Sequence, residues 1–474
     1  MNAAARALQE AANGEDAIGE LAAGFGRFFG ERVTIGPAVD TEEPVEYRDR
    51  RFTQQVTFWA FLLQVLTPGC ACREAVRRVQ LWWRERDSEK TLSSDTGAYC
   101  RARARLPFTW LQELHEALTS RLSERVAAHQ LWCERRVKTM DGTTSSMPDT
   151  AANQEFWPQQ KGQKPGCGFP IMRVVGLFCL SSGALLKTVR GTMYQAEPRL
   201  CRALWPALEK GDVLLADRGF CSYAIIARML AKGVDSVLRL HQRRKLGVKE
   251  GKWLGKGDRL ISWKRPPRSF AGLEGKCEDF DTLASELKLR VVQWRIEAPG
   301  FRTQEVILVT TLLDPEAYPA EALQDLYLRR WSVELHLREI KVLLGMDVLR
   351  CKSPEMIERE VLLHQIAYNL VRCVMQEAAE KHDAELLSLS FKGTLDTMRV
   401  WAPAIHAARH RPEQCKELYS AMLAIIAEDL LPYRPDRSEP RARKRRPKNY
   451  HLLTKPRHQM RVPSHRNRPK PVYP

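Results

Sequence analysis

The sequence lacks the long apolar runs that membrane proteins need. Its longest apolar stretches, 58–63 and 174–180, fall well short of the roughly 18 residues that span a bilayer. Residues 1–16 contain acidic side chains and no long apolar segment, unlike a secretory signal. The twelve cysteines include no CxxC pair, so a disulfide framework is not expected. These absences predict a cytoplasmic protein with reduced thiols and no membrane partner.

Composition limits the class further. The chain has 474 residues, 44% of them hydrophobic and 28% charged, which is ordinary for a folded globular protein. Disorder throughout, collagen and coiled coil are therefore excluded. At roughly 100–200 residues per domain, this length predicts about two to four domains.

Positive charge is concentrated in particular segments. The formal net charge is +18, and residues 434–474 hold 14 Lys and Arg against two acids. Residues 1–50 are acidic, whereas 51–110 carry ten Lys and Arg against five acids. Segmental basic charge is typical of proteins that bind nucleic acid, although a solubilising tail is the alternative. The Pro- and Arg-rich tail is expected to have little fixed structure. Its densest basic cluster is Arg443, Lys444, Arg445 and Arg446.

The first 130 residues predict a small helical domain. Apolar residues at helical spacing predict helices over 52–66, over the CREAVRRVQLWWRER segment, from about Ser93 to Pro107, and over 109–129. Such a domain often binds DNA, but the third helix could equally be a solvated surface. The basic segment of this region includes Arg73, Arg77, Arg78, Arg101, Arg103 and Arg105.

The pattern changes to alternating strands and helices after about residue 133. A strand over 137–141 is expected to end at Asp141, and VLLA forms a strand that leads into Asp217. Two strands meet at Ser181-Ser182-Gly183, which is a hairpin signal. Further strands are expected over 235–310, and long helices over about 319–344 and 354–380. This order is typical of an α/β fold.

Three acids stand in positions that favour a metal site. Asp141 and Asp217 follow strands, where α/β proteins build their sites, and Glu334 lies on a predicted helix. Three carboxylates suit hard cations such as Mg²⁺ or Mn²⁺, and two such ions can assist displacement at phosphorus. Each acid alone could instead be a cap, a turn residue or a surface charge. Glu339, five residues on, is the weaker alternative for the third acid.

The helix around Glu334 carries a mixed polar stripe. Tyr327, Arg330, Glu334 and Lys341 follow the spacing Y-x2-R-x3-E-x6-K. Steps of three, four and seven place all four on one face of an α-helix. One acid, two bases and a phenol suit a face turned toward phosphates and metal.

This spacing resembles the signature of bacterial insertion-sequence transposases of the DDE type, specifically the insertion-sequence-four family. The segments DGTT, LLADRGF, VILVTTLLD and HQIAYNLVR occur in the matching context, and the resemblance covers roughly 135–375. YCRARARLP and the basic tail also look like segments of these proteins. The resemblance implies an RNase H-like catalytic core whose first and fourth strands present Asp141 and Asp217.

The resemblance also implies a division of the chain. A helical DNA-binding region (1–132) precedes the first part of the core (133–232). A β-rich insertion follows, then the second part of the core with C-terminal helices, and finally the basic tail. The boundaries expected for these last three parts are 233–305, 306–433 and 434–474.

The implied activity is metal-dependent cut-and-paste DNA transposition. Asp141, Asp217 and Glu334 would be catalytic and would hold two Mg²⁺ or Mn²⁺ ions. Tyr327, Arg330 and Lys341 would contact DNA, and Trp331 and Trp294 are candidates for stacking on a base displaced at a hairpin intermediate, although either could be core packing. The implied partners are terminal inverted repeats, target DNA and a second copy of the chain, in a bacterial nucleoid. The alternatives are a catalytically silent DNA-binding regulator derived from a transposase, and a nuclease of the same fold.

Overall fold

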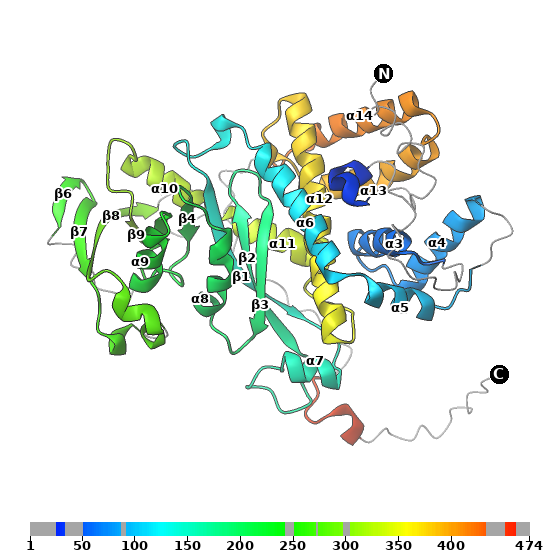
Figure 1. Cartoon of the computed structure of the whole chain (residues 1–474), viewed down its shortest axis with the longest axis horizontal. Coiled ribbons are helices and arrows are strands. Elements are labelled where there is room, and N and C mark those ends of the chain that lie inside the picture. The colour runs from blue at the N-terminus through cyan, green and yellow to red at the C-terminus, as the bar shows by residue number, and fades with distance from the viewer. Residues whose placement is uncertain are drawn as a thin grey trace, which may run out of the picture.

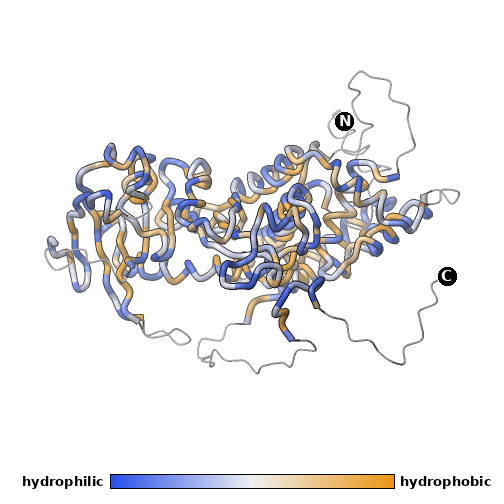
Figure 2. Tube along the Cα trace, turned by 90° about the horizontal axis from the view of Figure 1, so that it is seen from below, coloured by the Kyte–Doolittle hydropathy of each residue, from blue (hydrophilic) through white to orange (hydrophobic). Residues whose placement is uncertain are grey.

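The computed structural model describes residues 25–33, 51–86, 92–241, 251–271, 274–296, 304–432 and 451–460. Within these ranges no helix is long and apolar enough to cross a membrane. Figure 2 shows hydrophobic and hydrophilic residues interspersed along the described chain. The basic cluster at Arg443, Lys444, Arg445 and Arg446 lies outside the described residues.

One mixed sheet runs from one end of the molecule to its middle (Figure 1). Its nine strands lie in the order β3-β2-β1-β4-β5-β9-β8-β7-β6. Strands β4 and β5 run parallel to β1, and every other neighbouring pair is antiparallel. The strands are β1 (Val137–Ser146), β2 (Ile171–Cys179), β3 (Leu185–Thr192), β4 (Val213–Ala216), β5 (Asp235–Arg239), β6 (Lys252–Gly255), β7 (Asp258–Lys264), β8 (Glu286–Ile296) and β9 (Gln304–Thr310).

Strand β1 is longer than the sequence predicts. Asp141 does not end it, because β1 continues to Ser146 in antiparallel pairing with β2. The parallel pairing with β4 covers only 137–139. The polar stretch after Asp141 therefore forms one arm of a hairpin with β2, and half-buried positions along it accept Thr and Ser side chains. The predicted β2–β3 turn is present, with Gly183 at a φ of 68°.

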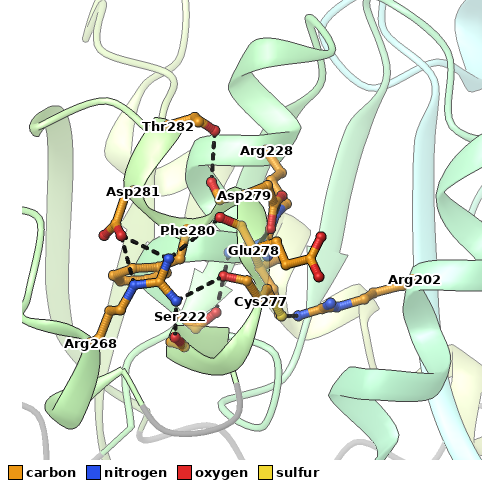
Figure 3. Close-up of polar contacts among 12 residues, drawn as sticks. Arg202, Ser222, Arg228, Arg268, Cys277, Glu278, Asp279, Phe280, Asp281 and Thr282 are labelled. Carbon is orange, nitrogen blue, oxygen red and sulfur yellow. Dashed lines mark hydrogen bonds and ion pairs between the residues drawn. The ribbon is translucent and has the colours of Figure 1, made fainter.

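The strands between 252 and 310 extend the same sheet. Strand β9 pairs with β5 and with β8, so the β-rich segment continues the core edge to edge. The β7–β8 connection contains a short 3-10 helix, η7 (Glu278–Thr282), anchored by the fully buried Phe280. Arg228 on α9 (Tyr223–Ala231) grips Asp279 with two hydrogen bonds of 2.6 and 2.7 Å (Figure 3). This ion pair fixes the β7–β8 connection to α9, the helix that follows β4.

Helices cover the other half of the molecule (Figure 1). The four N-terminal helices were predicted to within a few residues. The helices are α3 (Gln54–Leu66), α4 (Cys72–Arg86), α5 (Gly97–Arg105), α6 (Phe108–Glu124), α7 (Ala151–Phe156), α8 (Glu197–Leu200), α9, α10 (Ala320–Arg329), α11 (Ser332–Arg338), α12 (Pro354–His382), α13 (Phe391–Ala407) and α14 (Pro412–Glu428). The 3-10 helix η1 (Gly26–Val33) precedes them.

The helical stretch predicted over about 319–344 is present, but it is not one continuous α-helix. The chain forms α10, then a tight turn at Arg330 and Trp331 closed by hydrogen bonds to residues three positions earlier, then α11. A π-helical turn, η8 (Glu339–Leu343), follows. Apolar periodicity reports which side of a segment is buried and cannot distinguish these turns from a continuous α-helix. The wider π turn also changes the direction of Lys341 relative to Glu334.

The N-terminal helices share one hydrophobic core with the C-terminal helices. Leu111, Leu114 and Leu118 of α6 are fully buried in the same cluster as Leu363 and Leu370 of α12. In Figure 1, α6 lies alongside α12. A salt bridge also links the two helices, because Arg125, at the C-terminal end of α6, lies 3.0 Å from Glu380 of α12.

Part of the tail is ordered, contrary to the expectation of little fixed structure. Residues 451–460 include a short 3-10 helix, η10 (Arg457–Gln459). Pro456 lies against Gly166, where an added Cβ would stand 2.9 Å from the proline ring. This part of the tail therefore packs on the loop between α7 and β2.

Candidate active site

Three charged residues form a row across the sheet. The β1–β4 register pairs Thr139 with Leu215, so two residues further on Asp217 is level with Asp141. The β4–β5 register pairs Ala216 with Leu238, which brings Arg239 to the same level on β5. Neighbouring strands are roughly 4.8 Å apart, so these side chains are neighbours. The row lies just beyond the last parallel pairs of β1 with β4 and of β4 with β5, at the edge where α/β proteins build their sites.

Asp141 is held in a crowded acidic environment. The Gly142 N–H donates a 2.8 Å hydrogen bond to Asp141 Oδ1. Burial, with smaller contributions from the negative charges of Glu197 and Glu334, raises the pKa of Asp141 to about 6, and the Gly142 N–H and Arg330 oppose this. Glu197 lies over Gly142, where an added Cβ would come within 2.5 Å of its carboxylate. A cation at this place would relieve the repulsion among these carboxylates.

Arg330 is the buried cation of the site. Its Nη2 lies 3.3 Å from Glu334 Oε1, and its side chain is 7% exposed against 45% for Glu334. Although burial lowers the pKa of Arg330, the charges of Tyr327, Asp217, Glu334 and Asp141 raise it overall. Arg330 therefore stands within electrostatic reach of all three predicted acids. Its guanidinium carbon also lies 5.6 Å from the ring centre of Tyr327.

Tyr327 connects the polar row to the β8 strand. The side chain is buried, and its ring packs edge-on against Trp294 with centroids 6.1 Å apart. Burial and the charge of Asp217 raise the pKa of Tyr327, although Arg330 and a hydrogen bond from Arg239 oppose this. The ring centre of Trp331 lies 5.8 Å from the guanidinium carbon of Arg330. One tryptophan thus contacts Tyr327 and the other contacts Arg330, and both are half-buried.

The three predicted acids come together electrostatically but do not form a closed ligand cage. No three His, Cys, Asp or Glu side chains in the described part of the chain are grouped closely enough to hold a metal ion. The α11 helix directs Glu334 to Arg330. Glu339, the alternative third acid, is turned away and pairs with Arg372 at 2.5 Å. Metal binding by Asp141, Asp217 and Glu334 therefore stays a prediction.

The basic face of the N-terminal helices is smaller than the sequence predicts. Arg103 is buried, with its guanidinium carbon 4.7 Å from the Phe61 ring centre and 4.9 Å from that of Tyr99. It therefore packs inside the helical core and is not available to DNA. Arg78 is half-buried and contacts Glu74 at 3.1 Å. Of the six arginines singled out from the sequence, the exposed ones are Arg73, Arg77, Arg101 and Arg105.

Sequence reasoning missed Arg239 and Glu197. Arg239 reads as one polar residue at the end of an apolar strand, and only the β4–β5 register reveals its place beside Asp217. Glu197 precedes Pro198, a pattern that indicates only a helix start. Neither residue carries a local signal of function, because its importance depends on strands distant in the sequence.

The comparison with protein families decides the identity of the chain. Residues 132–370 match the family described as "Transposase DDE domain", and this segment contains the whole charged row and the Arg330–Glu334 pair. The chain is a member of the DDE transposase family. The sequence motifs predicted that this segment resembles DDE transposases of insertion sequences. The family match confirms that prediction.

Individual transposases are similar over different lengths. The chain is 28% identical over 335 residues to transposase InsG of insertion sequence element IS4 from Escherichia coli strain K12, covering 70% of this chain and 73% of that protein. It is 30% identical over 205 residues to the transposase of insertion sequence element IS421 from Escherichia coli, covering 36% of this chain and 52% of that protein. A solved piggyBac transposase synaptic complex with hairpin DNA aligns with a TM-score of 0.42 and 10% identity over 91% of this chain and 87% of that one.

Proposed function

We propose that this member of the transposase family catalyses metal-dependent DNA transposition, by cleaving the ends of an element and joining them to target DNA. The observation that carries the proposal is the row of Asp141 and Asp217, which are level with each other just beyond the parallel pairing of β1 with β4, with Glu334 and Arg330 within electrostatic reach of Asp141. The antiparallel β3-β2-β1 unit followed by parallel β4 and β5 supports an RNase H-like core.

The donor set fits hard divalent cations. Asp141, Asp217 and Glu334 offer only carboxylate oxygens, which Mg²⁺ and Mn²⁺ prefer, and the row contains no Cys or His. The crowding that raises the pKa of Asp141 is the arrangement a cation stabilises. Two bound ions would supply charge stabilisation for the attacking and leaving oxygens of an in-line displacement.

The basic and aromatic residues around the acids would orient the DNA. Arg330 and Lys341 would hold phosphates beside the scissile bond, with Arg330 suited to bidentate contact. The Tyr327 ring, packed on Trp294, gives Arg330 a fixed support. The same groups can act in nicking and in hairpin formation, because both steps are in-line attacks at phosphorus.

In the hairpin route, the freed 3′-hydroxyl attacks the opposite strand and water then opens the hairpin. A tight hairpin displaces a base, and unstacking it costs a few kcal/mol. Stacking on an aromatic ring returns roughly 1–3 kcal/mol per base. Trp331 and Trp294 are the candidate rings.

We also infer that two copies of the chain form a homodimer that holds two element ends. The exposed arginines of the N-terminal helices and the basic tail would bind duplex DNA.

Cleavage of a labelled duplex that carries the element's own flanking ends tests the proposal. In Mg²⁺, the wild-type protein should excise precisely, whereas Asp141→Asn, Asp217→Asn and Glu334→Gln should bind the ends and not cleave. Asp325→Asn, which changes an exposed carboxylate on α10, is the matched control and should cleave normally. Strong cleavage by Asp217→Asn would remove that residue from the catalytic set.

A denaturing gel separates the later step. Arg330→Ala and Lys341→Ala should leave first-strand nicking measurable and depress hairpin formation, so that nicked strand accumulates. Equal loss of nick and hairpin would show that these residues only assemble the complex.

A further inference from the structure

The α12 helix carries a stripe of buried polar side chains in the HQIAYNLVR segment. Gln365, Tyr368, Asn369 and Arg372 follow steps of three, one and three, which place them on one helical face. Each is at most 3% exposed. Four polar side chains are kept in a core only when they are hydrogen-bonded, so their partners indicate what the stripe does.

Three of the four hold the β2–β3 hairpin. Asn369 receives a backbone hydrogen bond from the Leu185 N–H and returns one to the Leu185 carbonyl, which fixes α12 in register with β3. The contacts are Leu185 N to Asn369 Oδ1 at 3.0 Å, Asn369 Nδ2 to Leu185 O at 2.9 Å, Gln365 Nε2 to Thr188 Oγ1 at 2.9 Å, and Tyr368 OH to Gly183 O at 2.6 Å.

The fourth residue, Arg372, holds the segment that bears Glu334. Its Nη2 donates to Glu339 Oε2 at 2.5 Å and lies 2.7 Å from His336 Nδ1. Its Nε donates to Tyr368 OH at 3.0 Å, so the guanidinium is joined to the hairpin contact as well. Because Arg372 is 2% exposed, Glu339 compensates a buried charge. Glu339 opens the π turn directly after α11, the seven-residue helix that carries Glu334.

The β2–β3 turn packs closely against Arg372 and His336 at Gly183. A Cβ on Gly183 would stand 3.1 Å from Arg372 Cζ and 3.1 Å from His336 Cε1, and Gly183 adopts a φ of 68°. The turn, α12 and the end of α11 therefore meet at van der Waals contact. A second link joins the same parts, because the Ser146 N–H at the end of β1 donates to the Asp347 carbonyl just after η8.

We propose that Arg372 and Glu339 are positioning residues that set Glu334 relative to Asp141. Asp141 lies on β1, which pairs with β2 and through it with β3, and α12 is fixed to β3. The same helix contacts His336 of α11 and, through the Arg372–Glu339 pair, the π turn that directly follows α11. The positions of Asp141 and Glu334, which lie on different elements, are thus both fixed relative to α12. Neither Arg372 nor Glu339 touches the reacting atoms. This inference rests on the proposed role of Glu334.

Mn²⁺ binding to the full-length protein tests the inference without relying on cleavage. Free Mn²⁺ is measured by electron paramagnetic resonance during titration, and each variant's folding is measured by urea denaturation. Arg372→Gln should bind Mn²⁺ about tenfold more weakly, the lower end of the effect of removing an outer-shell partner. Arg372→Lys keeps the charge but loses the forked contact, so its affinity should lie between those of Arg372→Gln and the wild type.

The matched control breaks another buried ion pair. Asp258→Asn disrupts the Arg290–Asp258 pair, which joins β7 to β8 and is as deeply buried. It should lose stability and keep wild-type Mn²⁺ affinity. Unchanged affinity in Arg372→Gln, or an equal loss in Asp258→Asn, overturns the positioning role.

Two further variants separate the possible failures. If Arg372→Gln does not fold, Glu339→Gln, which removes the charge at nearly constant volume, must show the weakened Mn²⁺ binding for the inference to stand. Glu334→Gln reports on the proposed function. Wild-type Mn²⁺ binding by Glu334→Gln would refute the metal role of Glu334 itself, whatever the result at Arg372.

Discussion

Acid should weaken the contact between α6 and α12 through His115. The side chain is 6% exposed, and its Nε2 lies 3.2 Å from Asn369 Nδ2, which can only donate. A neutral Nε2 can accept a hydrogen bond from this amide, whereas a protonated Nε2 cannot. Burial lowers the pKa of His115 to about 4, with a smaller lowering by Arg190 and an opposing hydrogen bond to Leu185.

The magnitude follows from the difference between folded and unfolded pKa values. The unfolded histidine titrates near 6.5, so the stabilisation is complete above that pH and is lost as the pH falls toward 4. The full loss is about 3.4 kcal/mol, at 1.36 kcal/mol per pKa unit, and about 2 kcal/mol of it is lost by pH 5. His336 and His364 change in the same direction, because burial also lowers their pKa values.

Urea denaturation at pH 7.5 and pH 5.0 measures this loss. In His115→Gln, which keeps a neutral polar side chain, the free energy of unfolding should fall between the two pH values by about 2 kcal/mol less than in the wild type. Any change in the variant's stability at pH 7.5 does not affect the test, because the comparison uses only the difference in unfolding free energy between the two pH values. An equal fall in both proteins would refute a neutral, buried His115.

Four other substitutions have expected outcomes. Arg103→Gln should lower the free energy of unfolding by about 1–3 kcal/mol in urea denaturation, because it removes a buried cation from two aromatic rings. Arg101→Gln, on the exposed face, should instead leave stability unchanged and weaken binding of duplex DNA in a mobility-shift assay; the reverse pattern would contradict the assignment of faces. Arg290→Met should cost about 3–5 kcal/mol by the same denaturation measurement, because Asp258 is left buried without its partner, and a change below about 1 kcal/mol would show that the site admits water. Gly183→Ala should lower the thermal midpoint, because its φ is positive and the added Cβ meets Arg372; an unchanged midpoint would contradict the close packing of the hairpin turn.

The sequence located the acids because their signals are local. Asp217 follows an apolar run that can only be a buried strand, and the family resemblance rests on spacing within one segment. Arg239 was not found, since its place beside Asp217 depends on the register between β4 and β5. The Arg372–Glu339 pair also went unnoticed, because it joins residues 33 positions apart on different helices.

Two errors show where local patterns lose information. Arg103 has the spacing of a surface residue, but the rings that bury it come partly from α3, another helix. The break between α10 and α11 leaves the apolar periodicity almost intact, because a 3-10 turn and a π turn alter the helical phase in opposite directions. Sequence reasoning therefore located most of the strands and named candidate acids, and it could not give the contacts between distant elements.

The shared core of α6 and α12 has a consequence for synthesis of the chain. The apolar face of α6, including Leu114 and Leu118, is covered by Leu363, Ile366 and Leu370. Those partners are translated more than 240 residues later. At about 5–20 residues per second, the ribosome makes them roughly 12–50 s after α6 has emerged. During that interval the N-terminal helices expose the surface that α12 will cover, so a chain whose translation stops before α12 keeps that surface open to chaperones and proteases.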